Sequence, residues 1–446
     1  MTRRTRKILF FGFLLIFLLS APLMILYYQG YRFDFEKKSL TQTGGLFLKV
    51  IPKQTEIYID GKLVKKTDFF FGSTLIENLL PKKYKIEIKK EGYFHWEKFL
   101  EIRAKEVTEA KNIVLFPKDI KFEILLKNVE NLWFSPNEKE IVLKEIENGN
   151  WVLKLYDLKR NIKSRLIGGK DIYTKGADLM GLEFSEASED SKEIYLDVGM
   201  KEQNKNFVLN LEKIPPLLTE KEIATLSENI VTSQTFNGDN YYLDNFGHLF
   251  KSPSAAEGEK LTEKPFPVKA ETEYKLSIFP EYIFLEEEKT LYQFNHDSKS
   301  FEKLFEKING LKISPDNKKL LFFSDPEIWV LFLKEKSNPP SKKAGEKILL
   351  IRLFSEKIES AFWLNSDYLI FNAGDKIKIA EIDERDKLNI VDLAEVDELP
   401  FISTHRPLSE EEARVFKNPE IFFNQIDRKL YVLSDGNLFQ SSPLLP

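Results

Sequence analysis

The ten residues FSPNEKEIVL at positions 134–143 decide the fold, because the chain contains them a second time in altered form. The later copy is ISPDNKKLLF at positions 313–322, and it matches the first almost position by position. In both copies, Ser-Pro followed by Asn or Asp separates two apolar segments, a pattern that predicts a strand, a tight turn and a strand. A hairpin that recurs so far along the chain indicates a repeated β architecture.

Other segments extend this repeat. Residues 242–252 (YLDNFGHLFKS) match residues 431–441 (YVLSDGNLFQS), with Gly247 and Gly436 in the same turn position, where we expect a positive φ. Further openings resemble the segment around Leu132, namely Leu182-Glu183-Phe184-Ser185, Val231, Leu276-Ser277-Ile278, Ala361-Phe362-Trp363 and Ile421-Phe422-Phe423. Successive openings are roughly 35 to 60 residues apart, and a four-stranded propeller blade takes about 40–50. The spacing therefore predicts six or seven blades.

The Ser-Pro-Asp/Asn turn resembles that of the WD40-like repeats in TolB-type propellers. This resemblance implies a β-propeller over residues 118–446, and an irregular pair of β-sandwiches is the alternative. A propeller must join its last blade to its first, since an open ring leaves unpaired strand edges. We therefore expect residues 121–126 to pair with the blade that contains Tyr431–Leu433 and Leu438–Phe439. Two polar segments, Ser252–Glu273 and Lys336–Lys347, are predicted to be exposed loops.

A small β domain is predicted over residues 45–117. Apolar residues alternate with other residues in segments 46–50 and 84–88, as in half-buried strands. Residues 57–59 are apolar and run into Asp60-Gly61, a strong indication of a hairpin.

The order of these segments resembles the PEGA domain, a small β-sandwich module of extracytoplasmic bacterial and archaeal proteins. The matching positions are Pro52, Ile57-Tyr58-Ile59-Asp60-Gly61, Leu80-Pro81, Tyr84-Lys85-Ile86, Lys90-Glu91-Gly92-Tyr93 and Trp96. The chain departs from the family at two places: Pro52-Lys53-Gln54-Thr55 replaces the tetrapeptide that names the family, and Lys82 follows Pro81 where Gly is usual. The family has no established enzymatic activity, so the resemblance implies a structural or binding role.

Residues Ile8–Tyr28 form a run of 21 residues without a charge. As a helix this run spans roughly 31 Å, about the thickness of a bilayer's hydrocarbon core. Four basic residues precede the run and three follow it closely, which favours a cytoplasmic N-terminus. A cleavable signal peptide is the alternative, but the run is long for one and Pro22 follows the best cleavage position at Ala21. We expect an uncleaved anchor in the lipid bilayer, a cytoplasmic tail of residues 1–7 and a polar stalk over residues 29–44.

Composition excludes several classes of function. The 446 residues include 70 acidic and 66 basic side chains, and this near balance argues against a nucleic-acid-binding protein. The absence of cysteine excludes disulfides, thiolate metal sites and cysteine nucleophiles. A hydrophobic share of 42% is ample for folded cores.

The sequence predicts no catalytic, cofactor or metal site. The four histidines, His95, His248, His296 and His405, share no metal-binding spacing, and no nucleophile elbow, phosphate loop or dinucleotide motif is present. Glu286–Glu288 and Glu410–Glu412 are interpreted as solvated faces. Asn237–Asn240 is interpreted as a hairpin turn, since it lacks the later acid of a calcium loop. Lysines at 82, 83, 85, 89 and 90 form a basic stripe, either an exposed strand face or a contact for anionic wall polymer or lipid headgroups.

These observations predict an all-β protein with an N-terminal transmembrane helix, a PEGA-like sandwich and a propeller. We expect a single-pass protein of the cell membrane with most of its chain extracytoplasmic. Its propeller is expected to bind an envelope protein or glycan without catalysis. An envelope hydrolase or lyase with its site in the propeller channel is the alternative, and a sensor with a partner across the membrane is a third hypothesis.

Overall fold

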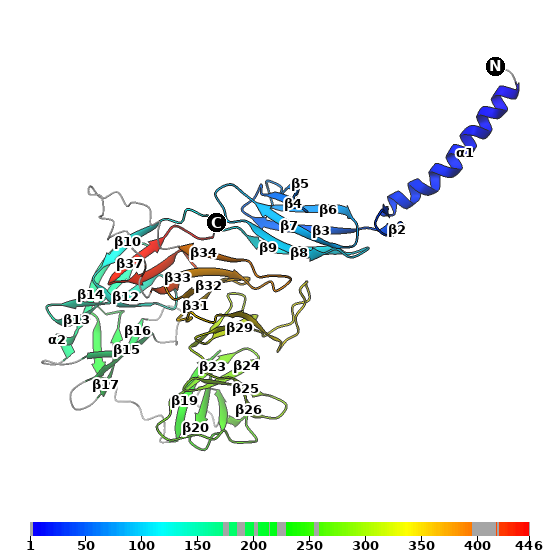
Figure 1. Cartoon of the computed structure of the whole chain (residues 1–446). Helices are drawn as coiled ribbons and strands as arrows, with labels where there is room; N and C mark the ends of the chain where they lie inside the picture. The colour runs from blue at the N-terminus through cyan, green and yellow to red at the C-terminus, as the bar shows by residue number, and fades with distance from the viewer. Residues whose placement is uncertain are drawn as a thin grey trace, which may run out of the picture.

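The structure is a computed structural model that describes residues 3–172, 178–184, 192–199, 204–213, 215–220, 229–253, 258–394, 416 and 419–445. The elements of these residues are strands, apart from an N-terminal helix and the single turn α2 (Gly169–Ile172). Figure 1 shows the N-terminal helix, then a small β region, then a larger β region. The small region has two sheets and the larger one has seven.

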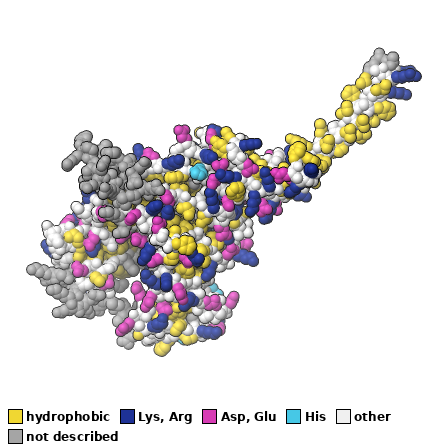
Figure 2. All heavy atoms as spheres, in the orientation of Figure 1, with side chains coloured by type: hydrophobic (Ala, Val, Ile, Leu, Met, Phe, Trp, Pro, Cys, Tyr) yellow, Lys and Arg dark blue, Asp and Glu magenta, His cyan; other side chains and the backbone are white. Residues whose placement is uncertain are grey.

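Helix α1 (Arg3–Tyr28) confirms the predicted apolar helix, and none of its residues is buried. It projects from the rest of the molecule, its sides are covered by hydrophobic side chains, and basic residues mark its N-terminal end (Figures 1 and 2). Within the described part of the chain, α1 is the one helix long and apolar enough to cross a membrane. The segment predicted as a stalk contains a hairpin of β1 (Tyr31–Asp34) and β2 (Ser39–Gln42).

The small region is a sandwich of two sheets that share one core. The first sheet has the order β6 (Ser73–Leu79), β3 (Gly44–Ile51), β9 (Val107–Val114). The second has the order β5 (Lys62–Lys66), β4 (Glu56–Ile59), β7 (Lys83–Lys89), β8 (Trp96–Glu101). The predicted alternation is confirmed, because Leu46, Leu48 and Val50 from one sheet meet Ile86 and Ile88 from the other in a single buried cluster.

The larger region, which we call the seven-sheet region, consists of seven antiparallel sheets of four strands each among the described residues. The first three sheets are β11 (Val129–Phe134), β12 (Glu140–Glu147), β13 (Asn150–Asp157), β14 (Ile162–Gly168); β15 (Asp178–Phe184), β16 (Glu193–Gly199), β17 (Asn204–Asn210), β18 (Leu217–Glu220); and β19 (Ile230–Phe236), β20 (Asp239–Asp244), β21 (Leu249–Pro253), β22 (Glu259–Lys260). The fourth and fifth are β23 (Tyr274–Phe279), β24 (Tyr282–Glu287), β25 (Thr290–Asn295), β26 (Ser300–Phe305); and β27 (Gly310–Ile313), β28 (Lys319–Phe323), β29 (Glu327–Phe332), β30 (Lys347–Arg352). The sixth and seventh are β31 (Ala361–Asn365), β32 (Tyr368–Ala373), β33 (Lys376–Glu381), β34 (Ile390–Ala394); and β35 (Glu420–Phe423), β36 (Leu430–Ser434), β37 (Asn437–Ser441), β10 (Phe122–Lys127).

The repeats found in the sequence occupy equivalent places in these sheets. Each Ser-Pro turn joins the first strand of a sheet to the second, and in both the serine hydroxyl bonds to the following Asn or Asp, Ser135 to Asn137 at 2.8 Å and Ser314 to Asp316 at 2.6 Å. Both glycine turns join the second strand to the third, and Gly247 has a φ of 82°. Ser185, at the end of one predicted opening, lies outside the described residues, while the other openings fall in first strands.

The seventh sheet confirms the predicted closure between the two ends of the region. Strand β10 pairs with β37, and Phe122 lies opposite Ser441. The C-terminus is structural as expected, since Leu444 is buried and its backbone N–H donates to the carbonyl of Arg428 at 2.8 Å. Buried apolar clusters join the first sheet to the second and to the seventh, and they also join each neighbouring pair from the third sheet to the seventh. No such cluster joins the second and third sheets within the described residues.

The prediction of two exposed loops is wrong in part. Residues 252–273 supply the short outer strand β22 and the side chain of Phe266, which is buried against Tyr274 and Tyr292. In the second segment Lys342 is buried and pairs with Glu346 at 2.8 Å. Turn-forming composition identified both connections, but it could not show that single side chains return to the core.

Candidate binding site in the central cavity

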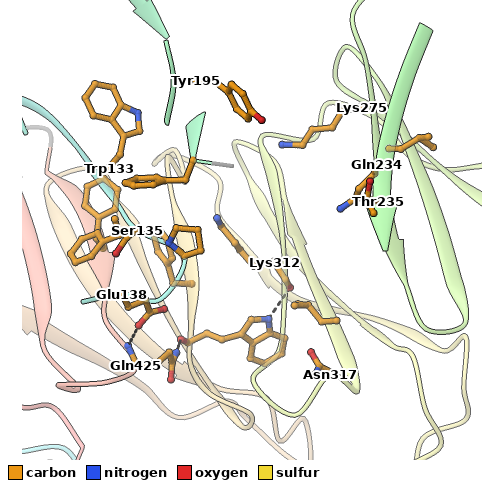
Figure 3. A pocket seen from close by; sticks show the side chains of 18 of the residues that line it. Trp133, Ser135, Glu138, Tyr195, Gln234, Thr235, Lys275, Lys312, Asn317 and Gln425 are labelled. Atoms are coloured by element: carbon orange, nitrogen blue, oxygen red, sulfur yellow. Dashed lines mark hydrogen bonds between the residues drawn. The ribbon is translucent and has the colours of Figure 1, made fainter. Parts of the chain in front are cut away.

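A cavity of about 1560 Å³ lies where the first strands of all seven sheets converge. Each sheet contributes at least one side chain from its first strand: Trp133, Phe184, Gln234, Lys275, Lys312, Trp363 and Phe422. Figure 3 shows side chains from several sheets directed toward a common space. The cavity is larger than the roughly 300–1000 Å³ of common small-molecule pockets, so it has room for a segment of a macromolecule.

Hydrogen bonds between neighbouring sheets hold the wall of this cavity together. The Gln425 side chain donates to the carbonyl of Trp363 at 2.6 Å, and the Trp363 indole donates to the carbonyl of Lys312 at 2.9 Å. On the other side, the backbone N–H of Ile278 donates to Oε1 of Gln234 at 2.7 Å. The Gln234 bond links the third sheet to the fourth. The Trp363 bonds link the sixth sheet to the fifth on one side and to Gln425, which follows β35 of the seventh sheet, on the other. These bonds hold the wall of the cavity in place before any ligand binds.

Two lysines bring positive charge to the cavity. Lys275 on β23 and Lys312 on β27 are both exposed, and Lys312 Nζ lies 5.5 Å from the centre of the Phe362 ring. Surrounding protein, and next the charge of Lys275, lower the pKa of Lys312. An anion is favoured only close to these ammonium groups, because the wall also carries the carboxylates of Glu138 and Glu273.

One carboxylate of the wall is already engaged. Glu138 lies in the first Ser-Pro turn, and its Oε2 accepts from the backbone N–H of Gln425 at 2.5 Å. Its backbone carbonyl accepts from the Asn424 side chain at 2.7 Å. Burial raises the pKa of Glu138, and the backbone N–H groups of Gln425 and Ile426 partly oppose that effect. This side chain joins the first sheet to the seventh.

A second buried polar cluster, the junction, attaches the sandwich to the sixth sheet. Lys98 Nζ on β8 pairs with Glu381 Oε1 at 2.8 Å and also donates to the backbone carbonyls of Asp383, Arg385 and Lys387. The Trp96 indole donates to Glu381 Oε2 at 2.8 Å. The side chain of Lys98 is 0% exposed, so every direction around its ammonium is protein. The junction fixes the sandwich against the seven-sheet region.

Of the candidate residues considered in the sequence analysis, those described in the structure lie outside the cavity, except for the turn at Asn237 and Gly238. His95 and His296 are exposed, His248 is half-buried beside Thr262 and Lys260, and His405 lies outside the described residues. Within the described part of the chain, no group of three His, Cys, Asp or Glu side chains is placed to hold a metal ion. Asn237 and Gly238 form the expected hairpin turn, with positive φ at both, and this turn borders the cavity.

The acidic cluster at 286–288 is not simply a solvated face. Glu287 is buried and accepts hydrogen bonds from the hydroxyls of Tyr274 and Tyr292 at 3.1 and 3.0 Å. Lys269 pairs with the same carboxylate at 2.9 Å. This network stabilises the fourth sheet. Glu410–Glu412 lies outside the described residues.

The basic stripe of the sandwich has acidic neighbours. Lys85 and Lys89 both pair with Glu87, at 3.5 and 3.0 Å, and Lys85 also reaches Glu97 at 3.1 Å. Lys82 lies 3.7 Å from Asp60. Because carboxylates share this face, the stripe is better described as an exposed strand face with ion pairs than as a concentrated anion site.

Sequence reasoning did not identify Lys275 and Lys312 as candidate site residues. A usable indication was present, because Lys312 stands in its repeat where Trp133 stands in the first, directly before the segment that opens the Ser-Pro turn. Aligning the repeats by these positions would have collected residues of the cavity wall from separate sheets.

Comparisons with known proteins do not identify a family for this chain. No protein-family model and no curated protein matches the sequence. Similar solved structures include a chain of the "Crystal Structure of Mitotic Checkpoint Complex", at TM-score 0.42 and 10% identity, covering 73% of this chain and 91% of that chain. Raptor from Chaetomium thermophilum aligns at TM-score 0.42 and 12% identity over 72% of this chain and 29% of its own. "YCF48 bound to D1 peptide" aligns at TM-score 0.39 and 10% identity over 72% of this chain and 94% of that chain.

This chain has a propeller-like, mostly β fold. The assignment depends on the seven four-stranded sheets and on the cavity that their first strands share.

Proposed function

We propose that this protein is a non-catalytic, single-pass membrane protein of the cell envelope that binds a partner protein or glycan in the central cavity of a seven-bladed propeller. The observation that carries the proposal is the cavity, since each of the seven sheets contributes its first strand to the wall. Propeller blades present broad, rigid surfaces at the ends of a central channel, which suits binding.

In this proposal the sandwich is a PEGA-like spacer between the bilayer and the propeller. Support comes from its place in the chain, between α1 and the seven-sheet region, and from the buried junction around Lys98. A rigid attachment would hold the cavity at a fixed orientation relative to the membrane.

The anchor is tested by membrane fractionation of the full-length protein. If Ile8–Tyr28 is an uncleaved span, the protein stays in the membrane pellet after carbonate extraction, because apolar helices of this length insert stably. Recovery of a soluble form that begins after Ala21 would contradict the anchor and favour a signal peptide.

The cavity is tested by placing a photo-crosslinking side chain at Ser233, an exposed residue of its wall, in the full-length protein in native membranes. The matched position is Ser300, which lies on the outer strand β26. We expect one defined partner to attach at Ser233 and not at Ser300. With the crosslinking side chain moved to Thr235, another exposed residue of the wall, attachment should fall when Ser233→Trp narrows the cavity. Equal capture at both positions, or capture that Ser233→Trp does not change, would contradict a cavity site.

The enzymatic alternative makes a different prediction for the same preparation. A hydrolase or lyase would convert the captured partner, and conversion would depend on a carboxylate of the wall. Glu138 and Glu273 are the described candidates. Turnover that Glu138→Gln or Glu273→Gln abolishes would replace the binding proposal with an enzymatic one.

A further inference from the structure

The two cavity lysines, Lys275 and Lys312, are exposed and form no ion pair within the described part of the chain. Among the described residues, no carboxylate oxygen lies within 4.0 Å of Nζ of Lys275 or Lys312, whereas Lys319 on the neighbouring strand β28 pairs with Asp316 at 2.9 Å. In Figure 3 the labelled side chains of Lys275 and Lys312 are directed into the cavity. Two ammonium groups on adjacent sheets, facing one cavity, are positioned to bind an anionic group there.

Three other polar groups of the wall are occupied by the protein itself, whereas Ser233, Thr235 and Glu273 are exposed on it. The carboxylate of Glu138 accepts from Gln425, the side-chain oxygen of Gln234 accepts from Ile278, and the Gln425 amide donates to Trp363. The three occupied groups join neighbouring sheets of the wall.

The remaining wall is rich in aromatic side chains. Trp133, Phe184, Phe362 and Phe422 are half-buried, so each offers part of its ring to an occupant. Aromatic surfaces combined with cationic groups suit apolar side chains and carboxylates together. A polypeptide segment supplies both kinds of group, while an anionic polysaccharide supplies carboxylates and hydroxyls.

We propose that the cavity binds an extended segment of a partner polypeptide in which acidic side chains are mixed with apolar ones. The carboxylates pair with Lys275 and Lys312, and the apolar side chains pack on the aromatic wall. This inference rests on the proposed binding function and assigns its ligand class.

The test uses full-length protein in nanodiscs and a display library of random twelve-residue peptides. Wild type is compared with the double variant Lys275→Gln/Lys312→Gln. The matched control is Lys299→Gln/Lys303→Gln, which removes the same charge from the outer edge of the fourth sheet, where the two lysines pair with Glu263 and Glu306. Selected peptides, their Glu→Gln and Asp→Asn counterparts, and polygalacturonate are then measured by fluorescence anisotropy at low and high NaCl.

We expect the selected peptides to be acidic and apolar, and binding to weaken about tenfold or more in the double variant but not in the control. Binding by wild type should also weaken as NaCl is raised. Neutral or basic peptides that bind both proteins equally would overturn the inference. Lysine-dependent binding of polygalacturonate without peptide binding would also overturn it, in favour of a glycan.

A blocked cavity separates this inference from the proposed function. If Ser233→Trp abolishes peptide binding while the lysine variant does not, the cavity binds partners but not through these charges. If neither variant changes binding of the selected peptides, the proposed cavity function fails together with the inference.

Discussion

The junction and the central cavity both enclose lysine side chains, and the two environments are opposite. Lys98 at the junction is 0% exposed and surrounded by Glu381 and three backbone carbonyls. Lys275 and Lys312 face an open cavity with no carboxylate within 4.0 Å among the described residues. A buried charge persists only when it is paired and hydrogen-bonded, so the junction is built for attachment. Charges that the protein leaves unpaired at a cavity are available to a ligand.

Deleting every residue after Asp427 should have the largest effect on stability. It should unfold the seven-sheet region and leave the sandwich folded. The deletion removes β36 and β37, leaves β10 without its partner, and exposes the cluster that joins the first and seventh sheets. We expect the seven-sheet region to unfold or aggregate while the sandwich, which has its own core, stays folded. Limited proteolysis and size-exclusion chromatography measure both outcomes. A truncated protein that remains monomeric and unfolds with native cooperativity would contradict closure.

Substituting Lys98 tests the junction directly. Lys98→Ala leaves Glu381 buried without its cation, which costs about 3–5 kcal/mol of unfolding free energy for a broken buried pair. The control is Lys85→Ala on the adjacent strand β7, whose ion pairs with Glu87 and Glu97 are partly exposed and contribute much less. Chemical denaturation compares the two. Equal losses would show that the junction is no more important than a surface pair.

Substitutions at the two glycine turns test the stability of the seven-sheet region without changing its charge. A Cβ on Gly247 would lie 1.8 Å from the carbonyl oxygen of Phe266, while on Gly436 its nearest neighbour, the carbonyl oxygen of Val129, is 3.8 Å away. Gly436→Ala should cost about 1–2 kcal/mol for the positive φ alone. Gly247→Ala should cost a further 1–3 kcal/mol or so, because Phe266 must shift in the core. Thermal unfolding measures both, and similar losses would show that the Phe266 segment yields freely.

Local patterns in the sequence predicted the sheets well. The Ser-Pro turns and the alternating apolar residues are short-range features, and the closure of the seventh sheet follows from the need to satisfy strand edges. The junction could not be derived in the same way, because the partners of Lys98 are far away in the chain. An indication was nevertheless present, since Lys98 alternates with Trp96 and Leu100 on the apolar face of its strand.

The cavity was harder to predict for a different reason. Its wall takes a few residues from each of seven sheets, so no single segment carries a recognisable motif. Phe266 shows a related limit, because it returns to the core from a segment whose composition is that of a loop. Aligning the repeats would help to find the residues of the cavity wall. The burial of Phe266 depends on tertiary packing, which no local pattern in the sequence shows.

Removing the cavity lysines should give the smallest change in the unfolding free energy. We expect a slight gain in stability, whereas Lys98→Ala should cause a loss. The folded state lowers the pKa of Lys312, so the unfolded chain holds the proton more strongly. The resulting cost to stability is fully present below the folded pKa and disappears as the pH rises toward 10.5, the ordinary value. Lys275→Gln/Lys312→Gln should therefore change the unfolding free energy at pH 7 by less than about 0.5 kcal/mol, in the stabilising direction.

The pH dependence completes this prediction. The small advantage of the double variant over wild type should shrink between pH 7 and pH 11, because wild type loses its unfavourable charge over that interval. Denaturant titrations of both proteins at several pH values measure it, with Lys299→Gln/Lys303→Gln as the control. A loss above about 2 kcal/mol at pH 7, comparable to that of a core or network substitution, would show that these lysines stabilise the fold as Lys98 does. An unchanged or slightly raised stability, together with weaker peptide binding, places them in a binding site.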